Sequence, residues 1–274
     1  EADGSGYMRE GFTHLFYISS EGGSPNKVTS EKYNHRSFEW NGNSNGFVFS
    51  SNYKEDWEYD FRNSELYSIN LDGSGLKQLT DRKGPDYGAV ISPDGNLIAY
   101  LGYDDKVQTY QTTNLYLMDI NGGNKREIKT NLDRSIASLK WSKDGKNLFF
   151  MYDDEGNTKV ALTSLYGKTK NLVDNVGGTT IGRPYGGGSY SISNNNKLVF
   201  TLTSPYHPSD IAINDGKSTN RLTNLNFDLL NKKDLGKVEE VWYKSSVDGR
   251  DIQGWIAKPP KFDSNKKYPL IVEN

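Results

Sequence analysis

Hydrophobic and polar positions recur along this chain with a period of about 50 residues. Each repeat opens on a hydrophobic residue, passes through a polar turn such as Ser92-Pro93-Asp94-Gly95, and continues into a hydrophobic run such as Leu97 to Tyr100. Successive repeats begin 51, 50 and 51 residues apart. The opening residues, which we call the anchors, are Trp40, Ile91, Trp141 and Ile192. This regular spacing indicates four copies of one structural unit.

Two further hydrophobic segments keep the same period. One precedes an Asp-Gly or Gly-Gly turn, as Leu66 to Ile69 does, and the other is a short strand that often ends in Leu-Thr, as at Leu79-Thr80. Short alternating runs separated by Gly, Asn and Asp favour hairpins, so each repeat is predicted to hold four strands. Helical periodicity is confined to a short connector between Leu225 and Leu235.

Four antiparallel strands in a unit of this length form one blade of a β-propeller. We therefore predict an all-β fold with four whole blades of four strands, preceded by half a blade. The whole blades are expected at residues 35–80, 87–130, 136–174 and 187–223, and the half blade at 12–30. Because known propellers close into rings, we expect further blade residues upstream of this sequence. The four anchors should occupy equivalent inner-strand positions and be buried between neighbouring sheets.

The composition excludes several classes of partner and site. Lys and Arg total 33 against 35 Asp and Glu, a net charge of −2, so no nucleic-acid partner is expected. With no cysteine, the chain has neither disulfides nor thiolate ligands. A mean hydropathy of −0.77 and the lack of a long apolar run predict no membrane insertion. The sequence begins at Glu1 without a Met or a visible signal peptide, so we expect it to be part of a longer protein.

The repeats resemble those of TolB-type propellers and of the propellers of the prolyl oligopeptidase family. The motifs that carry the resemblance are Ser92-Pro93-Asp94-Gly95 with Ile98 to Tyr100, and Leu115 to Asp119 with Gly122-Gly123. The resemblance extends over nearly the whole chain, through segments 52–62, 81–86, 183–185 and 204–211.

The C-terminal segment distinguishes these two families. Residues 238–249, 252–260 and 267–273 resemble the passage from propeller into α/β-hydrolase domain in acylaminoacyl-peptidase and dipeptidyl-peptidase-like members. In that family a Tyr-Pro-Leu-Ile strand, here Tyr268 to Ile271, runs into a His-Gly-Gly-Pro turn near the oxyanion hole. The sequence stops before that turn at Asn274, where an apolar residue is more usual.

The resemblance implies a parent serine peptidase that hydrolyses short peptides through a Ser-Asp-His triad beyond Asn274, with an acyl-enzyme intermediate and no cofactor. The propeller would admit short peptide substrates, and its protein partner would be its own α/β-hydrolase domain. The alternative is a non-catalytic TolB-like propeller that binds a protein partner. Location is open between the cytoplasm and the bacterial periplasm, with the periplasm expected because similar bacterial enzymes are exported.

No serine in the chain has the surroundings of a nucleophile. A hydrolase of this fold needs Gly-x-Ser-x-Gly on a strand-to-helix turn. The segment Gly187-Gly188-Ser189-Tyr190-Ser191 lacks the final glycine, and Gly4-Ser5-Gly6 and Gly73-Ser74-Gly75 have the wrong spacing. We therefore predict that the chain holds no catalytic residue and that residues 1–274 alone are inactive.

Metal and cofactor sites are not expected either. His14, His35 and His207 are too scattered in the repeat to suggest a cluster, and we interpret them as packing or surface residues. Acidic groups at 104–105 and 153–155 fall where hairpins turn and lack the spacing of an EF-hand. Adjacent glycines occur at 122–123, 177–178 and 186–188. Their spacing does not match a phosphate-binding motif.

One segment interrupts the repeat. Residues 53–61 lengthen a hairpin and mix aromatic with acidic side chains, a composition suited to holding a peptide amine or an aromatic residue. Trp57, Glu58 and Tyr59 are therefore the candidate peptide contacts. The alternative is a loop whose aromatic residues pack on its own blade or on a partner.

We expect three parts in the chain: propeller blades at 1–223, a connector at 224–236, and a linker with the first strands of the hydrolase domain at 237–274. Val241 to Lys244 and Ile252 to Ala257 should form a hairpin that leaves the propeller, because Pro259-Pro260 bars its continuation as a central strand. Without the hydrolase sheet, the hairpin would expose Trp255 and Ile256, so the chain should self-associate or leave this part mobile.

Overall fold

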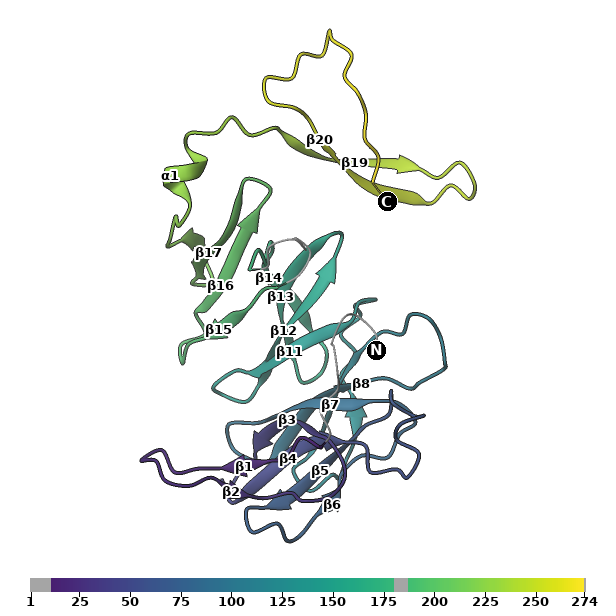
Figure 1. Cartoon of the computed structure of the whole chain (residues 1–274), viewed down its shortest axis with the longest axis vertical. Helices are drawn as coiled ribbons and strands as arrows, with labels where there is room; N and C mark the ends of the chain where they lie inside the picture. Colours follow the sequence, from purple (N-terminus) through teal and green to yellow (C-terminus); the bar gives the residue numbers. More distant parts are fainter. Residues whose placement is uncertain (1–10, 180–186, 274) are drawn as a thin grey trace. The chain divides into compact units, whose positions relative to one another are not determined.

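The computed structural model describes residues 11–179 and 187–273, and consists mainly of antiparallel strands (Figure 1). Four sheets follow one another along the chain, and each contains four strands paired in the order of the sequence. A two-stranded sheet, β1 (Phe16–Tyr17) with β2 (Asn26–Lys27), precedes them. These sheets confirm the predicted propeller blades, four whole and one half.

The strand bounds agree with the predicted blades to within a few residues. The first blade holds β3 (His35–Trp40), β4 (Gly46–Ser51), β5 (Glu65–Asn70) and β6 (Lys77–Gln78). The second holds β7 (Asp86–Ile91), β8 (Leu97–Gly102), β9 (Asn114–Asp119) and β10 (Arg126–Glu127). The third holds β11 (Ile136–Trp141), β12 (Asn147–Asp154), β13 (Asn157–Ser164) and β14 (Thr169–Val173). The fourth holds β15 (Tyr190–Ile192), β16 (Leu198–Ser204), β17 (His207–Asn214) and β18 (Thr219–Arg221).

A recurring turn joins the first two strands of the second, third and fourth blades. In the second blade the Ser92 hydroxyl donates to Asp94 Oδ1 at 2.5 Å and accepts from the Leu97 N–H at 2.9 Å. Gly95 has φ +75°, a conformation open to glycine and tolerated by asparagine. The third and fourth blades use the same bonds at Ser142 with Asp144 and Asn147, and at Ser193 with Asn195 and Lys197. The Ser-x-Asp-Gly motif is therefore a self-bonded turn.

A second recurring contact explains the Leu-Thr endings. The Thr80 hydroxyl, just after β6, accepts the Leu66 N–H at the start of β5 at 2.8 Å. The same contact joins Thr29 to Leu15 at 3.0 Å and Thr223 to Ile211 at 2.9 Å. Each threonine follows the last strand of its sheet and satisfies a backbone donor in or beside the strand paired with it.

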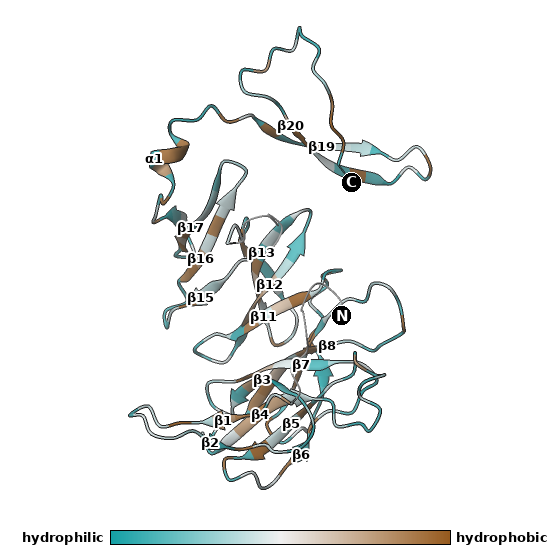
Figure 2. Cartoon of the chain, in the orientation of Figure 1, coloured by the Kyte–Doolittle hydropathy of each residue, from teal (hydrophilic) through white to brown (hydrophobic). Residues whose placement is uncertain are grey.

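The hydrophobic cores lie between consecutive sheets. Leu115 of the second blade and Phe150 of the third belong to one cluster, and Val48 of the first blade and Tyr100 of the second belong to another. All four side chains are almost fully buried. Figure 2 shows hydrophobic residues along the middle strands of the blades. Since burying one such side chain contributes about 1.5–3 kcal/mol, contact between sheets stabilises the first three blades.

The anchors confirm one prediction and correct another. Each is the last residue of the first strand of its sheet, so their positions are equivalent as predicted. Their expected burial is wrong: Trp40 is 42% exposed, and Ile91, Trp141 and Ile192 are only partly buried. The first strand is an edge strand and its last residue adjoins a turn, whereas the middle strands are covered on both faces. Trp141 still contacts the preceding blade, since its indole N–H donates to the Val90 carbonyl at 3.0 Å.

The first strands of three blades carry a bulge at the same place. The pairing register shifts after the second residue of β3, β7 and β11. The third residues, Ser37, Gly88 and Ser138, have φ values of +47°, +62° and +55°. Bulges of this kind bend a strand and redirect the neighbouring side chains. The residues before them, Arg36 and Tyr87, both reach the pocket described below.

Contacts divide the described chain into two compact units. One contains residues up to 154 together with 158–174 and 192–197, and the other contains 155–157, the described residues of 175–191, and 198–273. In the second unit, α1 (Phe227–Leu230) is a single helical turn within the predicted connector, and β19 (Val238–Lys244) pairs with β20 (Asp251–Ala257). This hairpin forms a sheet of its own, as predicted. Across the described ranges, no helix is long and apolar enough to cross a membrane.

Candidate functional site

A pocket of the first unit lies beside the loop that interrupts the repeat. Residues 52–64, which we call the insertion loop, join β4 to β5. Together with the start of β3, the end of β4 and the start of β7, they enclose about 520 Å³. The lining residues are Asn34, Arg36, Ser37, Ser50, Ser51, Asn52, Trp57, Phe61, Arg62, Asn63, Ser64, Pro85 and Tyr87. We call this cavity the insertion pocket.

The insertion loop is folded around Asp60. The Asp60 carboxylate accepts from Lys54 Nζ at 2.7 Å and from Asn63 Nδ2 at 3.0 Å. These two hydrogen bonds lower the pKa of Asp60. The Asn52 amide donates to the Asp60 carbonyl at 3.0 Å, which ties the loop to the end of β4. The loop therefore has a defined internal structure that positions its aromatic side chains.

The three predicted contact residues are placed differently. Trp57 is half-buried, lines the insertion pocket, and meets Phe12 edge to face with ring centroids 6.2 Å apart. Glu58 and Tyr59 are absent from the described lining, and Tyr59 is 87% exposed. The structure brings only Trp57 to the pocket, and the role of all three in peptide binding stays a prediction.

Sequence reasoning missed most of the remaining pocket. Phe61 and Arg62 belong to the insertion loop, and Arg36 and Tyr87 come from β3 and β7. Arg36 and Tyr87 are 51 residues apart, which is the repeat distance, so they hold equivalent places in consecutive blades. That spacing was the available signal, but it does not reveal that both side chains reach one cavity.

Most polar groups of the pocket are already engaged in holding the backbone. Ser50 Oγ donates to the Arg36 carbonyl at 3.1 Å, and Ser51 Oγ donates to the Asn34 carbonyl at 2.9 Å. The Asn34 side-chain oxygen in turn accepts from the N–H of Thr13 at 2.9 Å. These contacts shape the wall and leave few donors facing the cavity.

Two acidic side chains are buried where β5 and β7 begin. Asp86 N–H donates to the Ser64 carbonyl at 2.7 Å, which sets Asp86 beside Glu65. Asp86 forms a close ion pair with Arg82, Nε to Oδ1 2.9 Å, and the guanidinium stacks over Tyr116. Burial raises the pKa of Glu65 to about 7 and that of Asp86 to about 6, despite the opposing pull of Arg82. Carboxyl groups with raised pKa values suit acid–base chemistry. Both of these side chains are buried, so we assign them to the contact between blades.

Two of the three histidines lie close together, which the sequence did not predict. His14 and His35 are not scattered, because their ring centroids are 5.4 Å apart. Both ring nitrogens of buried His35 are occupied: Nδ1 lies 2.9 Å from the Thr13 carbonyl and Nε2 lies 2.8 Å from the Tyr53 hydroxyl. The repeat register did not predict this contact because it joins the half blade to the next sheet. In the described residues, no group of three acidic or histidine side chains could hold a metal ion.

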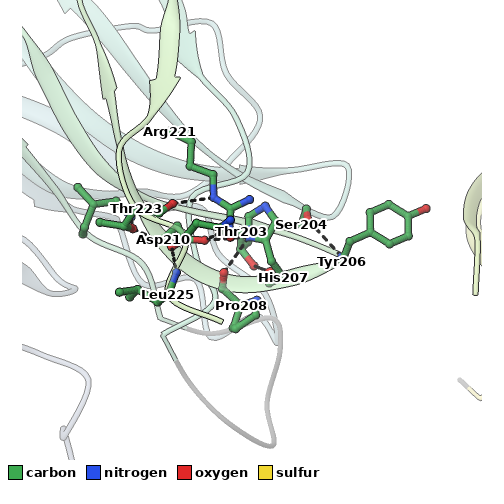
Figure 3. A network of polar contacts seen from close by, with 11 residues as sticks. Thr203, Ser204, Tyr206, His207, Pro208, Asp210, Arg221, Thr223 and Leu225 are labelled. Atoms are coloured by element: carbon green, nitrogen blue, oxygen red, sulfur yellow. Dashed lines mark hydrogen bonds and ion pairs between the residues drawn. The ribbon is translucent and has the colours of Figure 1, made fainter. Parts of the chain in front are cut away.

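In the fourth blade a buried carboxylate organises the end of the last strand. Figure 3 shows Arg221, Thr223 and Leu225 converging on Asp210. The Thr223 hydroxyl donates to Asp210 Oδ1 at 2.7 Å, the Leu225 N–H donates to it at 3.0 Å, and Arg221 pairs with Oδ2. Burial alone would raise the pKa of Asp210, but these donors outweigh it and lower the value. His207 lies at the edge of this network, where its Nδ1 is 3.7 Å from Asp210 Oδ2 and 2.8 Å from the Pro208 carbonyl oxygen.

The serine segments lack the geometry of a nucleophile turn. Residues 187–189 lead directly into β15, and the Ser189 N–H donates to the Thr201 hydroxyl at 3.0 Å. Ser74 sits in the tight turn between β5 and β6, where its hydroxyl donates to Asp72 at 2.7 Å. Gly4-Ser5-Gly6 lies outside the described residues. Neither described segment joins a strand to a helix.

Comparison with known proteins shows that this chain is similar in sequence to peptidases. The family described as the dipeptidyl peptidase IV N-terminal region matches residues 5–104. Dipeptidyl-peptidase 5 of Porphyromonas gingivalis is 24% identical over 244 residues, which cover 86% of this chain and 34% of that protein. The chain spans about a third or less of the length of the curated relatives it matches.

Solved structures show the same fold. Porphyromonas gingivalis dipeptidyl peptidase 4 aligns with a TM-score of 0.59 at 16% identity, over 90% of this chain and 34% of that one. TolB from Acinetobacter baumannii aligns with a TM-score of 0.53 at 16% identity, over 89% of this chain and 57% of that one. Over most of its length the chain is therefore similar in sequence to dipeptidyl-peptidase 5 proteins, and its fold is the β-propeller fold that the peptidase and TolB structures share.

Proposed function

We propose that this chain is the substrate-gating propeller of a serine peptidase that hydrolyses short peptides. The Ser-Asp-His triad would come from the remainder of the protein, through an acyl-enzyme intermediate. The propeller would admit short peptides to the active site and exclude folded proteins. The observation that carries the proposal is the similarity to dipeptidyl-peptidase 5 along most of this chain.

The β19–β20 hairpin supports the proposed domain organisation. Trp242, Trp255 and Ile256 are each between 44% and 53% exposed although their strands are paired. Such apolar side chains usually mark a surface that another domain covers. We propose blades at 1–223, a connector at 224–236 and the start of an α/β-hydrolase domain at 237–274. The hydrolase sheet would cover this hairpin.

Of the three predicted peptide contacts, Trp57 is the one that lines the insertion pocket. Its indole lines the insertion pocket beside Phe61, so the loop offers an aromatic wall to a peptide side chain. Glu58 and Tyr59 remain proposed contacts at the exposed outer part of the loop. Loops on a rigid scaffold are frequent sites of recognition.

The test is an assay of the whole protein with chromogenic substrates. Dipeptidyl, aminoacyl and N-acetylaminoacyl p-nitroanilides distinguish whether the enzyme removes dipeptides, single residues or acylated residues. We expect turnover that a serine-directed fluorophosphonate abolishes, with no turnover by residues 1–274 alone. A Ser189→Ala variant of the whole protein should retain its activity, because Ser189 is not placed as a nucleophile. Absence of turnover on all three substrates would contradict the proposal.

The TolB-like alternative predicts a different result. A non-catalytic propeller would show no turnover and no labelling by the fluorophosphonate in the whole protein. The TolB structure supports the shared fold alone, and sequence similarity to peptidases favours the catalytic proposal.

A further inference from the structure

We propose that the insertion pocket binds a carboxylate of the peptide through Arg36 and Arg62. This inference rests on the proposed peptide substrate and adds the chemical group that the propeller recognises. It assigns the pocket a binding role for an anionic group next to an aromatic wall.

The free donors of the pocket carry the argument. Among the described residues, neither Arg36 nor Arg62 has an ion pair, although both residues line the same cavity. The polar groups of Asn34, Ser50 and Ser51 are bound to backbone atoms. Guanidinium groups bind carboxylates with two parallel hydrogen bonds, which gives both affinity and orientation.

The charge of the pocket favours an anion over an amine. No carboxylate is among its described lining residues, so a peptide amine would meet two positive charges and no counter-charge. Asp105 is the acidic residue whose pKa Arg62 helps to lower, after hydrogen bonds from Gln111 and the Val107 N–H. Those two bonds already engage Asp105, at 2.7 and 2.9 Å. Arg62 thus remains available to a ligand.

The aromatic residues determine what lies beside the carboxylate. Trp57, Phe61 and Tyr87 line the same cavity, and the Arg62 guanidinium lies 5.7 Å from the centroid of the Phe61 ring. Stacking of this kind orients a guanidinium while leaving its N–H edge free. A short peptide that carries an apolar side chain near a carboxylate fits both features.

The carboxylate could come from the peptide C-terminus or from an acidic side chain, and four peptides separate these sources. The probes are Ala-Phe-Ala, its C-terminal amide, Ala-Phe-Glu-amide and Ala-Phe-Gln-amide, titrated calorimetrically into the 274-residue chain. Loss of the recognised carboxylate should weaken binding about tenfold. Preference for Ala-Phe-Ala over its amide indicates the C-terminus, and preference for the Glu over the Gln peptide indicates a side chain.

Arg36→Gln and Arg62→Gln test the assignment. Each should abolish the preference for the carboxylate peptide, whereas Arg126→Gln should preserve it. Arg126 is a matched control because it is also an exposed arginine, and it contacts the Leu165 carbonyl away from the pocket. Thermal unfolding of each variant verifies that it is folded.

Several results would overturn the inference. They are equal binding of each charged peptide and its neutral counterpart, no saturable binding of any peptide, or a preference that both arginine variants retain. Turnover by the whole protein tests the proposed function separately. If the enzyme hydrolyses short peptides but the arginine variants bind carboxylates as before, only this inference fails. If carboxylate binding holds and the whole protein has no turnover, only the proposed peptidase function fails.

Discussion

The second blade and the β19–β20 hairpin are both antiparallel and both carry large apolar side chains, yet they differ in burial. Ile98, Tyr100 and Leu115 of the second blade are almost fully buried, while Trp255 and Ile256 of the hairpin are exposed. Strand pairing satisfies the backbone donors and acceptors in both regions. Apolar burial requires a second layer as well, and the blades provide it for one another. The difference therefore separates strands that a neighbouring sheet covers from strands whose apolar side chains stay exposed.

The largest effect is expected from matched aliphatic truncations in the two regions. Leu115→Ala removes a fully buried side chain between two blades and should cost about 2–5 kcal/mol of unfolding free energy. Ile256→Ala on the exposed hairpin should cost less than about 1 kcal/mol. Urea unfolding of both variants measures the contrast. Equal costs would show that the hairpin is packed as tightly as a blade.

The next effect concerns the buried Glu65 at the contact between the first two blades. Its pKa is raised to about 7, so the folded chain binds more protons than the unfolded one between about pH 4.5 and 7. Stability is therefore greatest below that window and falls as the pH rises through 7. Glu65→Gln should flatten this dependence and raise stability at pH 8 by about 2 kcal/mol.

Unfolding curves from pH 4.5 to 8 measure this effect. The matched control is Glu240→Gln, since Glu240 is exposed on the hairpin. A Glu65→Gln variant with the same pH dependence as the wild type would show that this carboxyl group does not titrate in that range.

A smaller effect is expected at the threonine contacts. Thr80→Val keeps the shape of the side chain but removes the acceptor of the Leu66 N–H, so it should cost about 1–2 kcal/mol. Ser245→Ala in the exposed hairpin turn removes a similar acceptor of the Val247 N–H and should cost less than about 0.5 kcal/mol, because water replaces it. Thermal unfolding compares the two. If the costs match, burial does not set the value of this contact.

The smallest effect on stability is expected from making the hairpin surface polar. Trp255→Ser with Ile256→Ser should change the unfolding free energy little but should reduce concentration-dependent self-association of the chain. Sedimentation velocity at several concentrations measures this. Hydrogen exchange provides the second comparison, with faster exchange expected in β19 and β20 than in β8 and β9. A monomer with equal protection in both regions would place the hairpin in the propeller.

The repeat alone predicted most of the fold. Spacings of 51, 50 and 51 residues located the four sheets, and their strands lie close to the predicted ranges. This succeeded because turn motifs such as Ser92 with Asp94 make local contacts, and endings such as Thr80 make contacts within their own sheet. The burial of the anchors was predicted wrongly. Periodicity fixes a residue's place in a strand, but burial depends on the sheet packed against it.

The candidate site was only partly visible in the sequence. The interruption of the repeat identified the insertion loop and Trp57. The same pattern gave no reason to select Arg36, Arg62 or Tyr87, because their shared feature is a cavity formed by three separate segments. The contact between His14 and His35 was missed for the same reason.

The sequence by itself determined the blade repeat, the turns and the departure of the chain into a hairpin after the last blade. These features depend on periodicity, on residues that permit positive φ, and on prolines that exclude a continued strand. Only the tertiary structure decided which apolar residues are buried, which carboxyl groups have raised pKa values, and which arginines line a pocket. The physical reason is that desolvation and packing depend on neighbours distant in sequence, as Tyr116 shows by stacking on the Arg82 guanidinium that pairs with Asp86.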